Sequence, residues 1–172
     1  PDQAATVYAT FAKKDYRISA ESDGHGTVMS DKASAQYQDQ IKLSVIPKAG
    51  YRLYTLTYTP AGGNVTNIPV TEGVYEYSIS MPAADVKVRA VFDRIPVDGV
   101  TISQDNASMR VDDELALTAT VVPADALIQD ITWESSDASV ATVTGTVIVT
   151  DDGTVYSAKV KAVGTGDVTI YA

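Results

Sequence analysis

Two acidic clusters come nearest to a metal site, Asp112-Asp113-Glu114 and Asp151-Asp152-Gly153. Carboxylate oxygens are the ligands that Ca²⁺ prefers, and the ion takes about six to eight of them. Adjacent acids cannot complete such a shell, and neither cluster has the spacing of an EF-hand loop. The sequence therefore favours solvated turn acids at both places. We predict no metal site and no cofactor.

Tyrosines are a second group with chemical potential. An aromatic ring on an exposed sheet face can stack on a sugar ring, but tyrosine is also an ordinary strand residue that buries its ring and keeps its hydroxyl in water. Both interpretations stay open: an exposed coplanar row would favour sugar binding, and buried rings would favour a structural role. The tyrosines concerned are Tyr51, Tyr54, Tyr58, Tyr75 and Tyr77.

Catalytic motifs are scarce. The chain has no cysteine, so a thiol nucleophile and a cysteine zinc site are excluded. Its one histidine, His25, stands between two glycines and is expected in an exposed loop. No serine has a nucleophile-elbow motif, and no glycine cluster opens a helix to hold phosphate. We predict no catalytic residues and no enzymatic activity. The sequence alone leaves open catalysis by a pair of carboxylates.

Composition limits the partners. The 172 residues are 45% hydrophobic, so a packed core is expected, and the net charge is −9. An acidic protein is repelled by nucleic-acid phosphates and by anionic lipid, which argues against both. No apolar run approaches about 18 residues, so we expect no membrane insertion in this segment.

Apolar residues recur with a period of two, which buries one face of a strand. Turn residues divide these runs at fairly even intervals, for example at Asp23-Gly24 and Glu72-Gly73. Residues 123–128 are the one place where a single helical turn is plausible. We therefore predict an all-β fold. The clearest alternating runs are 41–45, 86–92, 115–121 and 158–162.

Charge divides the chain in two. Residues 1–92 hold nine acidic and nine basic side chains, whereas residues 93–172 hold thirteen acidic and four basic ones. Pro96 lies at the join, where it would interrupt a sheet ladder. We predict two modules in tandem, residues 13–94 and residues 95–172.

A weak repeat concerns the first twelve residues. Residues 1–13 and 82–94 share a proline and an alternating strand, with identities at Val7 and Val88 and at Phe11 and Phe92. We interpret residues 1–12 as the last strand of a preceding module in a longer array. The alternative is an ordinary N-terminal strand of the first module.

The second module contains Leu117-Thr118-Ala119-Thr120-Val121-Val122-Pro123, then Trp133-Glu134-Ser135-Ser136-Asp137 and Ser139-Val140-Ala141-Thr142-Val143. In this order the pieces resemble a bacterial immunoglobulin-like domain of group 2, which implies a β-sandwich. Trp133 should anchor its core. The serines and Asp137 should hold the turn that follows.

Two features depart from that resemblance. Asp112 or Asp113 stands where the family usually has a turn glycine. The sequence given stops at Ala172, whereas the family normally continues into one more strand. Truncation and an unpaired edge are the two interpretations.

The first module carries Ala49-Gly50-Tyr51-Arg52-Leu53 and ends on Met81-Pro82-Ala83-Ala84-Asp85-Val86. These pieces resemble the divergent InlB B-repeat, a small all-β module found in tandem on bacterial surface proteins.

Together the resemblances imply a non-catalytic stalk, spacer or interaction segment of a secreted or cell-surface bacterial protein. Its expected partners are neighbouring modules of the same array and a glycan or a host surface protein. The alternative is a carbohydrate-binding module that uses exposed tyrosines of the first domain.

Overall fold

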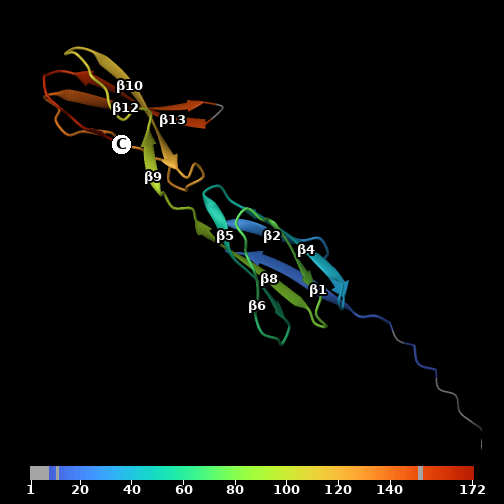
Figure 1. Ribbon diagram of the computed structural model, residues 1–172. Helices are drawn as coiled ribbons and strands as arrows, with labels where there is room; N and C mark the ends of the chain where they lie inside the picture. Colours follow the sequence, from blue (N-terminus) through green and yellow to red (C-terminus); the bar gives the residue numbers. More distant parts are fainter. Residues whose placement is uncertain (1–7, 11, 151–152) are drawn as a thin grey trace, which may run out of the picture. The chain divides into compact units, whose positions relative to one another are not determined.

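The computed structural model describes residues 8–10, 12–150 and 153–172. These residues divide into two compact units between Asp93 and Arg94, which we call the first and the second module. The described residues contain strands and turns and no helix, which confirms the predicted all-β fold (Figure 1). Accordingly, none of them forms a helix long and apolar enough to cross a membrane.

The first module is built from two sheets. The larger has the strand order β3-β1-β8-β5-β6, and the smaller has the order β2-β4-β7. The strands are β1 (Asp15–Ser22), β2 (Gly26–Ser30), β3 (Ser34–Gln36), β4 (Gln40–Pro47), β5 (Tyr51–Pro60), β6 (Thr66–Ile68), β7 (Glu76–Ser80) and β8 (Val86–Arg94).

Its first and last strands lie side by side and run parallel, with Ile18 opposite Val86 and Ser22 opposite Ala90 (Figure 1). The other pairings in the module for which a register is given are antiparallel, including β4 with β2 and with β7. A parallel pair needs a long crossover, and here the whole of the module connects the two strands.

One core fills the first module, and both sheets contribute to it. The alternating residues that the sequence predicted as inward-facing are almost fully buried, with Ile41 and Leu43 at 0% exposure. Every second residue of β8 from Val86 to Phe92 also belongs to this core. The alternating pattern therefore placed the inner faces of β4 and β8 correctly.

The second module has a four-stranded sheet of order β12-β13-β10-β9 and a small sheet of β11 and β14. All pairs are antiparallel. The strands are β9 (Gly99–Ile102), β10 (Glu114–Val122), β11 (Glu134–Ser135), β12 (Ala141–Thr150), β13 (Gly153–Ala162) and β14 (Ile170–Tyr171).

Its main core cluster is small. Leu117, Ala141 and Val160 are buried, and several apolar side chains around them are only partly buried. Trp133 packs against this cluster, as predicted. It also lies against the backbone of β12, because a Cβ built on Gly145 would be 2.9 Å from the Trp133 ring.

Two further predictions concern residues 123–128 and residues 1–12. Residues 123–128 form a hydrogen-bonded turn, with the Ala126 N–H donating to the Pro123 carbonyl at 3.1 Å, and not a helical turn. The residues after this turn show no helical spacing of apolar side chains, so packing does not stabilise a longer helix here. The interpretation of residues 1–12 as a strand falls mostly outside the described residues, and those described there, 8–10 and 12, are in no strand.

Candidate functional site

The five tyrosines considered for sugar binding do not share one face. Tyr51, Tyr58 and Tyr77 are partly buried and pack against the core of the first module. Tyr54 and Tyr75 are exposed, at 65% and 51%. The structure thus places three of the five rings where the structural interpretation predicted them.

A shift within β5 separates the tyrosines. Leu53 and Leu56 are both buried although they are three residues apart, so the alternation changes phase between them. Tyr51 precedes the shift and Tyr58 follows it, and both therefore point to the core. Tyr54 lies within the shift and points to solvent.

His25 is exposed, as predicted, but it is not isolated. Its ring stacks on Tyr51, with centroids 4.4 Å apart and planes 11° from parallel. Its carbonyl also accepts a hydrogen bond from the Lys48 N–H at 3.0 Å. His25 therefore joins two turns of the first module, a role that its loop sequence did not indicate.

The acids of the cluster at residues 112–114 each have a separate contact. The Asp113 carboxylate accepts a hydrogen bond from the Arg110 N–H at 2.8 Å and so closes the turn. Glu114 pairs with Lys159 at 2.9 Å. Asp112 has a positive φ of 71°, so it occupies the position where the family has glycine. Within the described residues no three acidic or histidine side chains converge as metal ligands; Asp151 and Asp152 lie outside them.

Two other aspartates, Asp23 and Asp137, accept hydrogen bonds from backbone N–H groups. Desolvation tends to raise the pKa of Asp23, but hydrogen bonds from the Phe92 and His25 N–H groups outweigh it and lower the pKa. Those bonds are 2.9 and 3.0 Å long. The Ser139 hydroxyl and N–H both donate to Asp137 and lower its pKa. Both carboxylates thus stabilise turns, as predicted for Asp137.

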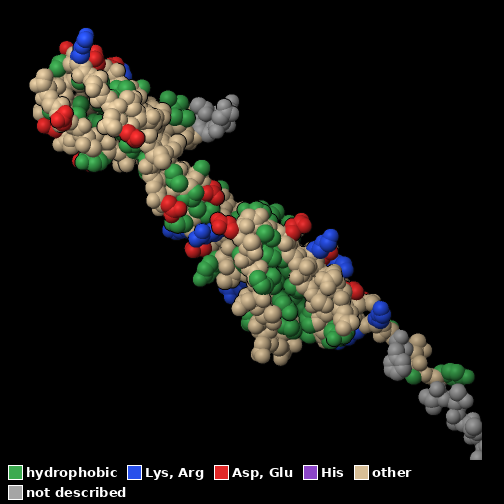
Figure 2. Space-filling model, viewed as in Figure 1, with side chains coloured by type: hydrophobic (Ala, Val, Ile, Leu, Met, Phe, Trp, Pro, Cys, Tyr) green, Lys and Arg blue, Asp and Glu red, His purple; other side chains and the backbone are tan. Residues whose placement is uncertain are grey.

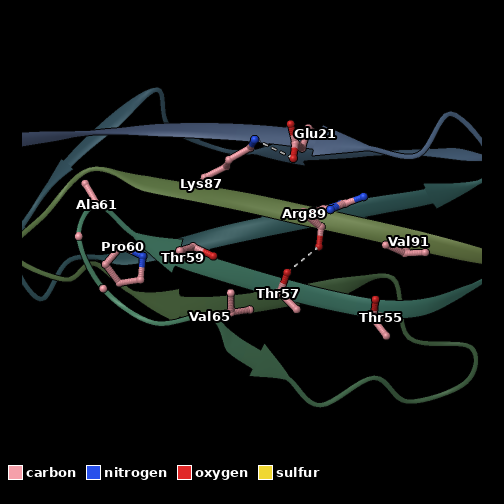
Figure 3. Close-up of a pocket in the computed structure, with 12 residues that line it drawn as sticks. Glu21, Thr55, Thr57, Thr59, Pro60, Ala61, Val65, Lys87, Arg89 and Val91 are labelled. Carbon is pink, nitrogen blue, oxygen red and sulfur yellow. Dashed lines mark hydrogen bonds and ion pairs between the residues drawn. The ribbon is translucent and has the colours of Figure 1, made fainter.

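A depression of about 710 Å³ lies on the outer face of the larger sheet in the first module. Thr55, Thr57 and Thr59 line it from β5, opposite Lys87 and Arg89 of β8 (Figure 3). Lys87 pairs with Glu21 at 2.9 Å, and Thr57 donates to the Arg89 carbonyl at 3.4 Å. The depression is the solvated side of strands whose other side forms the core.

A groove of about 810 Å³ with polar and apolar lining residues opens in the second module. The four-stranded sheet contributes Leu115, Leu117 and Val160 to its lining. Two loop segments, residues 104–107 and residues 167–169, line its two sides. The groove therefore reaches the core cluster itself, and partly buried Val168 packs against that cluster.

The hairpin of β12 and β13 adds an exposed apolar surface. Tyr156 is the last residue of β13 that pairs with β10 in the described ladder (Figure 1). Val147 lies opposite Tyr156, and Ile148 and Val149 lie beyond it; these three side chains are 56%, 48% and 77% exposed. Neighbouring apolar side chains that remain exposed are a common feature of protein contact surfaces.

Two family models match different parts of the chain. Residues 16–96 match the divergent InlB B-repeat domain, and residues 96–172 match the bacterial Ig-like domain (group 2). Both resemblances drawn from the sequence are confirmed, in the predicted order. The second module is therefore an Ig-like β-sandwich.

A curated relative is an Ig-like virion protein of Serratia phage KSP90, which is 40% identical over 74 residues. The match covers 43% of this chain and 25% of the relative, so the chain spans about a quarter of that protein's length. No solved structure matches the chain significantly.

Proposed function

We propose that the chain is a non-catalytic spacer and interaction segment of a protein displayed outside the cell, on a bacterial surface or on a virion. The match of the second module to the group 2 Ig-like domain carries this proposal. The phage relative supports the virion setting, and the InlB-type match supports the bacterial surface.

The parallel pair of β1 and β8 supports a mechanical role. The chain enters the first module at β1 and leaves it at β8, and these strands are hydrogen-bonded neighbours. A pull on the two ends of the module acts at opposite ends of this parallel pair. The ladder is therefore loaded along its length, so that its bonds must break together and not one after another.

The second module lacks that arrangement among its described residues. Its first strand, β9, pairs with β10, and its last, β14, pairs with β11. A pull on its ends therefore does not load one direct ladder between them. We expect the second module to unfold at the lower force.

Single-molecule stretching of the full chain tests the proposal. Two unfolding events are expected, each lengthening the chain by about 25 nm for a module of about 80 residues. Ser19→Pro removes a β1 N–H that points to β8, because N–H groups alternate along a strand and the neighbouring Ile18 N–H donates to Ala33 on the other side. It should lower the force of the stronger event. Asn67→Pro in β6, at the edge of the same sheet, is the matched control and should leave that force nearly unchanged. Extension without distinct events would contradict a load-bearing spacer.

Carbohydrate binding is the competing function. The inward packing of Tyr51, Tyr58 and Tyr77 weighs against it, and the exposed rings of Tyr54 and Tyr75 are its remaining support. A glycan array of the chain and of Tyr54→Ala separates the two functions, with exposed Tyr37 changed to Ala as the control. Binding that depends on Tyr54 alone would favour the carbohydrate function, and a blank array would remove it.

A further inference from the structure

The strand β12 leaves one edge of the four-stranded sheet open. It lies at the end of that sheet and has ten residues, whereas the next longest edge strands of the described chain, β2 and β7, have five each. Native edge strands are usually short, or they carry charges or proline that hinder pairing with another chain. Residues 141–150 contain no charged residue and no proline. β12 therefore lacks these protections.

Backbone groups along this edge have no partner from Val143 to Val149. The Ala141 N–H donates to the Asp137 carbonyl at 3.0 Å, and the Ala141 carbonyl accepts a bond from the Ser135 hydroxyl at 2.7 Å. Both groups point away from β13, and the direction of such groups repeats at every second residue of a strand. Those of the odd-numbered residues 143–149 therefore point to the open edge, and no hydrogen bond within the described part of the chain satisfies them there. Another strand can satisfy them.

The side chains of residues 143–149 suit a strand that runs in the opposite direction with the same sequence. All of them except Gly145 are β-branched, the type that packs well between neighbouring strands. Hydrophobic and other uncharged side chains cover the visible face of this hairpin, at the right of the second module in Figure 2. Taken inward from both ends, the stretch matches Val143 with Val149, Thr144 with Ile148 and Gly145 with Val147, and its centre is Thr146.

We propose that β12 pairs with β12 of a second copy of the chain, antiparallel and centred on Thr146. Residues 145 and 147 then exchange two hydrogen bonds across the interface, and residues 143 and 149 do the same. Val147 of the second copy lies opposite Gly145, on the face where the Trp133 ring packs, and contacts that ring. This pairing is independent of whether the chain also acts as a spacer.

Charge and interface size set the strength of the pairing. Residues 93–172 hold thirteen acidic and four basic side chains, so two copies of this module repel each other at long range. Salt screens that repulsion and leaves the contacts between uncharged strands in place. One strand from each copy also makes a small interface, so we expect a dissociation constant of about 10–100 µM that falls as salt is added. Copies held close together on one surface would pair at this affinity.

Sedimentation velocity of the full chain at about 5–500 µM measures the association, and hydrogen exchange at both ends of this range locates it. We expect a monomer–dimer equilibrium, with the amides of residues 143, 145, 147 and 149 protected at the high concentration. The dimer should be the largest species, because pairing occupies the open edge of both copies.

Substitutions at Thr146 test the register. Thr146→Lys places two lysines opposite each other and should raise the dissociation constant at least about fivefold, and Thr146→Glu should do the same. An equimolar mixture of the two variants should pair more tightly than either alone. The matched control is exposed Thr118 of β10, because Thr118 and Thr146 both lie opposite Ser157 and Thr118 is two strands from the open edge. Thr118→Lys and Thr118→Glu should change the dissociation constant much less.

Several results would overturn the proposal. One is a chain that stays monomeric at about 500 µM in about 0.5 M salt. Another is a dimer whose protected amides lie outside residues 143–149, and hydrogen exchange gives this answer without any substitution, even if a Thr146 variant fails to fold. The proposal is also wrong if the Thr146 variants pair as well as their Thr118 counterparts, or if the mixture of Thr146 variants pairs no more tightly than each variant alone.

Discussion

Ser136 and Thr169 are joined by two hydrogen bonds across the second module. The Ser136 N–H donates to the Thr169 carbonyl at 2.9 Å, and the Thr169 N–H donates to the Ser136 hydroxyl at 2.9 Å. The hydroxyl takes the place of a backbone carbonyl, so the pairing of β11 with β14 continues by one residue. This explains one serine of the W-x-S-S-D sequence, while Ser135 binds the Ala141 carbonyl at 2.7 Å.

Ser136→Ala should therefore weaken the second module. The variant leaves the Thr169 N–H without its acceptor, so the free energy of unfolding should fall by about 1 kcal/mol. Trp133 is the one tryptophan of the chain, and its fluorescence during urea unfolding reports on this module. Ser108→Ala removes a hydroxyl that has no partner among the described residues and should change little. Equal effects of the two variants would show that the Ser136 bond contributes nothing.

Gly26 allows the Phe92 ring to lie directly on β2. A Cβ at Gly26 would overlap this ring, and Phe92 belongs to the core of the first module. Gly26→Ala should lower the free energy of unfolding of that module by about 1–3 kcal/mol, because the ring must shift within a packed core. Circular dichroism during urea unfolding follows this change.

The control for Gly26 is Gly99→Ala in β9, where a Cβ would have no neighbour within 4 Å. Gly99→Ala should leave stability unchanged or raise it slightly. An unchanged first module in Gly26→Ala would mean that the ring has room to move.

Asp112→Gly should stabilise the second module. Asp112 has a φ of 71°, a conformation that glycine adopts without the steric cost borne by other residues, and its contact with Lys161 is long at 3.7 Å. We expect the free energy of unfolding, followed by Trp133 fluorescence, to rise by about 0.5–1 kcal/mol. Asp125→Gly, at an exposed position with a negative φ, should instead be neutral or destabilising. The same result for both variants would refute backbone strain as the cause.

The inner faces of the strands could be predicted from the sequence because they depend on local alternation. Ile41, Leu43 and Val45 are buried as their spacing required. Turn positions followed in the same way, since glycines such as Gly24 and Gly73 have positive φ. Asp137 was also predicted to hold its turn, because an aspartate can accept bonds from nearby backbone groups.

Features that depend on distant parts of the chain were not predicted. No local pattern indicates that Ile18 lies opposite Val86, because the two are 68 residues apart. The change of phase between Leu53 and Leu56 decides which tyrosines of β5 are exposed, but both leucines are ordinary strand residues. The groove of the second module is lined by residues as far apart in the sequence as Asp105 and Asp167, so no local pattern indicates it.

Asp23 should make the stability of the first module depend on pH. Its pKa is lower in the folded state, so its contribution is present above the unfolded pKa of about 3.9 and is lost as the pH falls through the folded pKa. Asp23→Asn should be less stable than the original chain at neutral pH, and the difference should shrink toward about pH 3. Urea unfolding followed by circular dichroism at several pH values measures both. Asp15→Asn removes the same charge from exposed β1 without removing an acceptor of the Phe92 N–H. Two results would show that the hydrogen bonds to Phe92 and His25 do not set this dependence. One is a stability difference between Asp23→Asn and the original chain that stays constant over this pH range. The other is a stability difference for Asp15→Asn that shrinks with falling pH by the same amount.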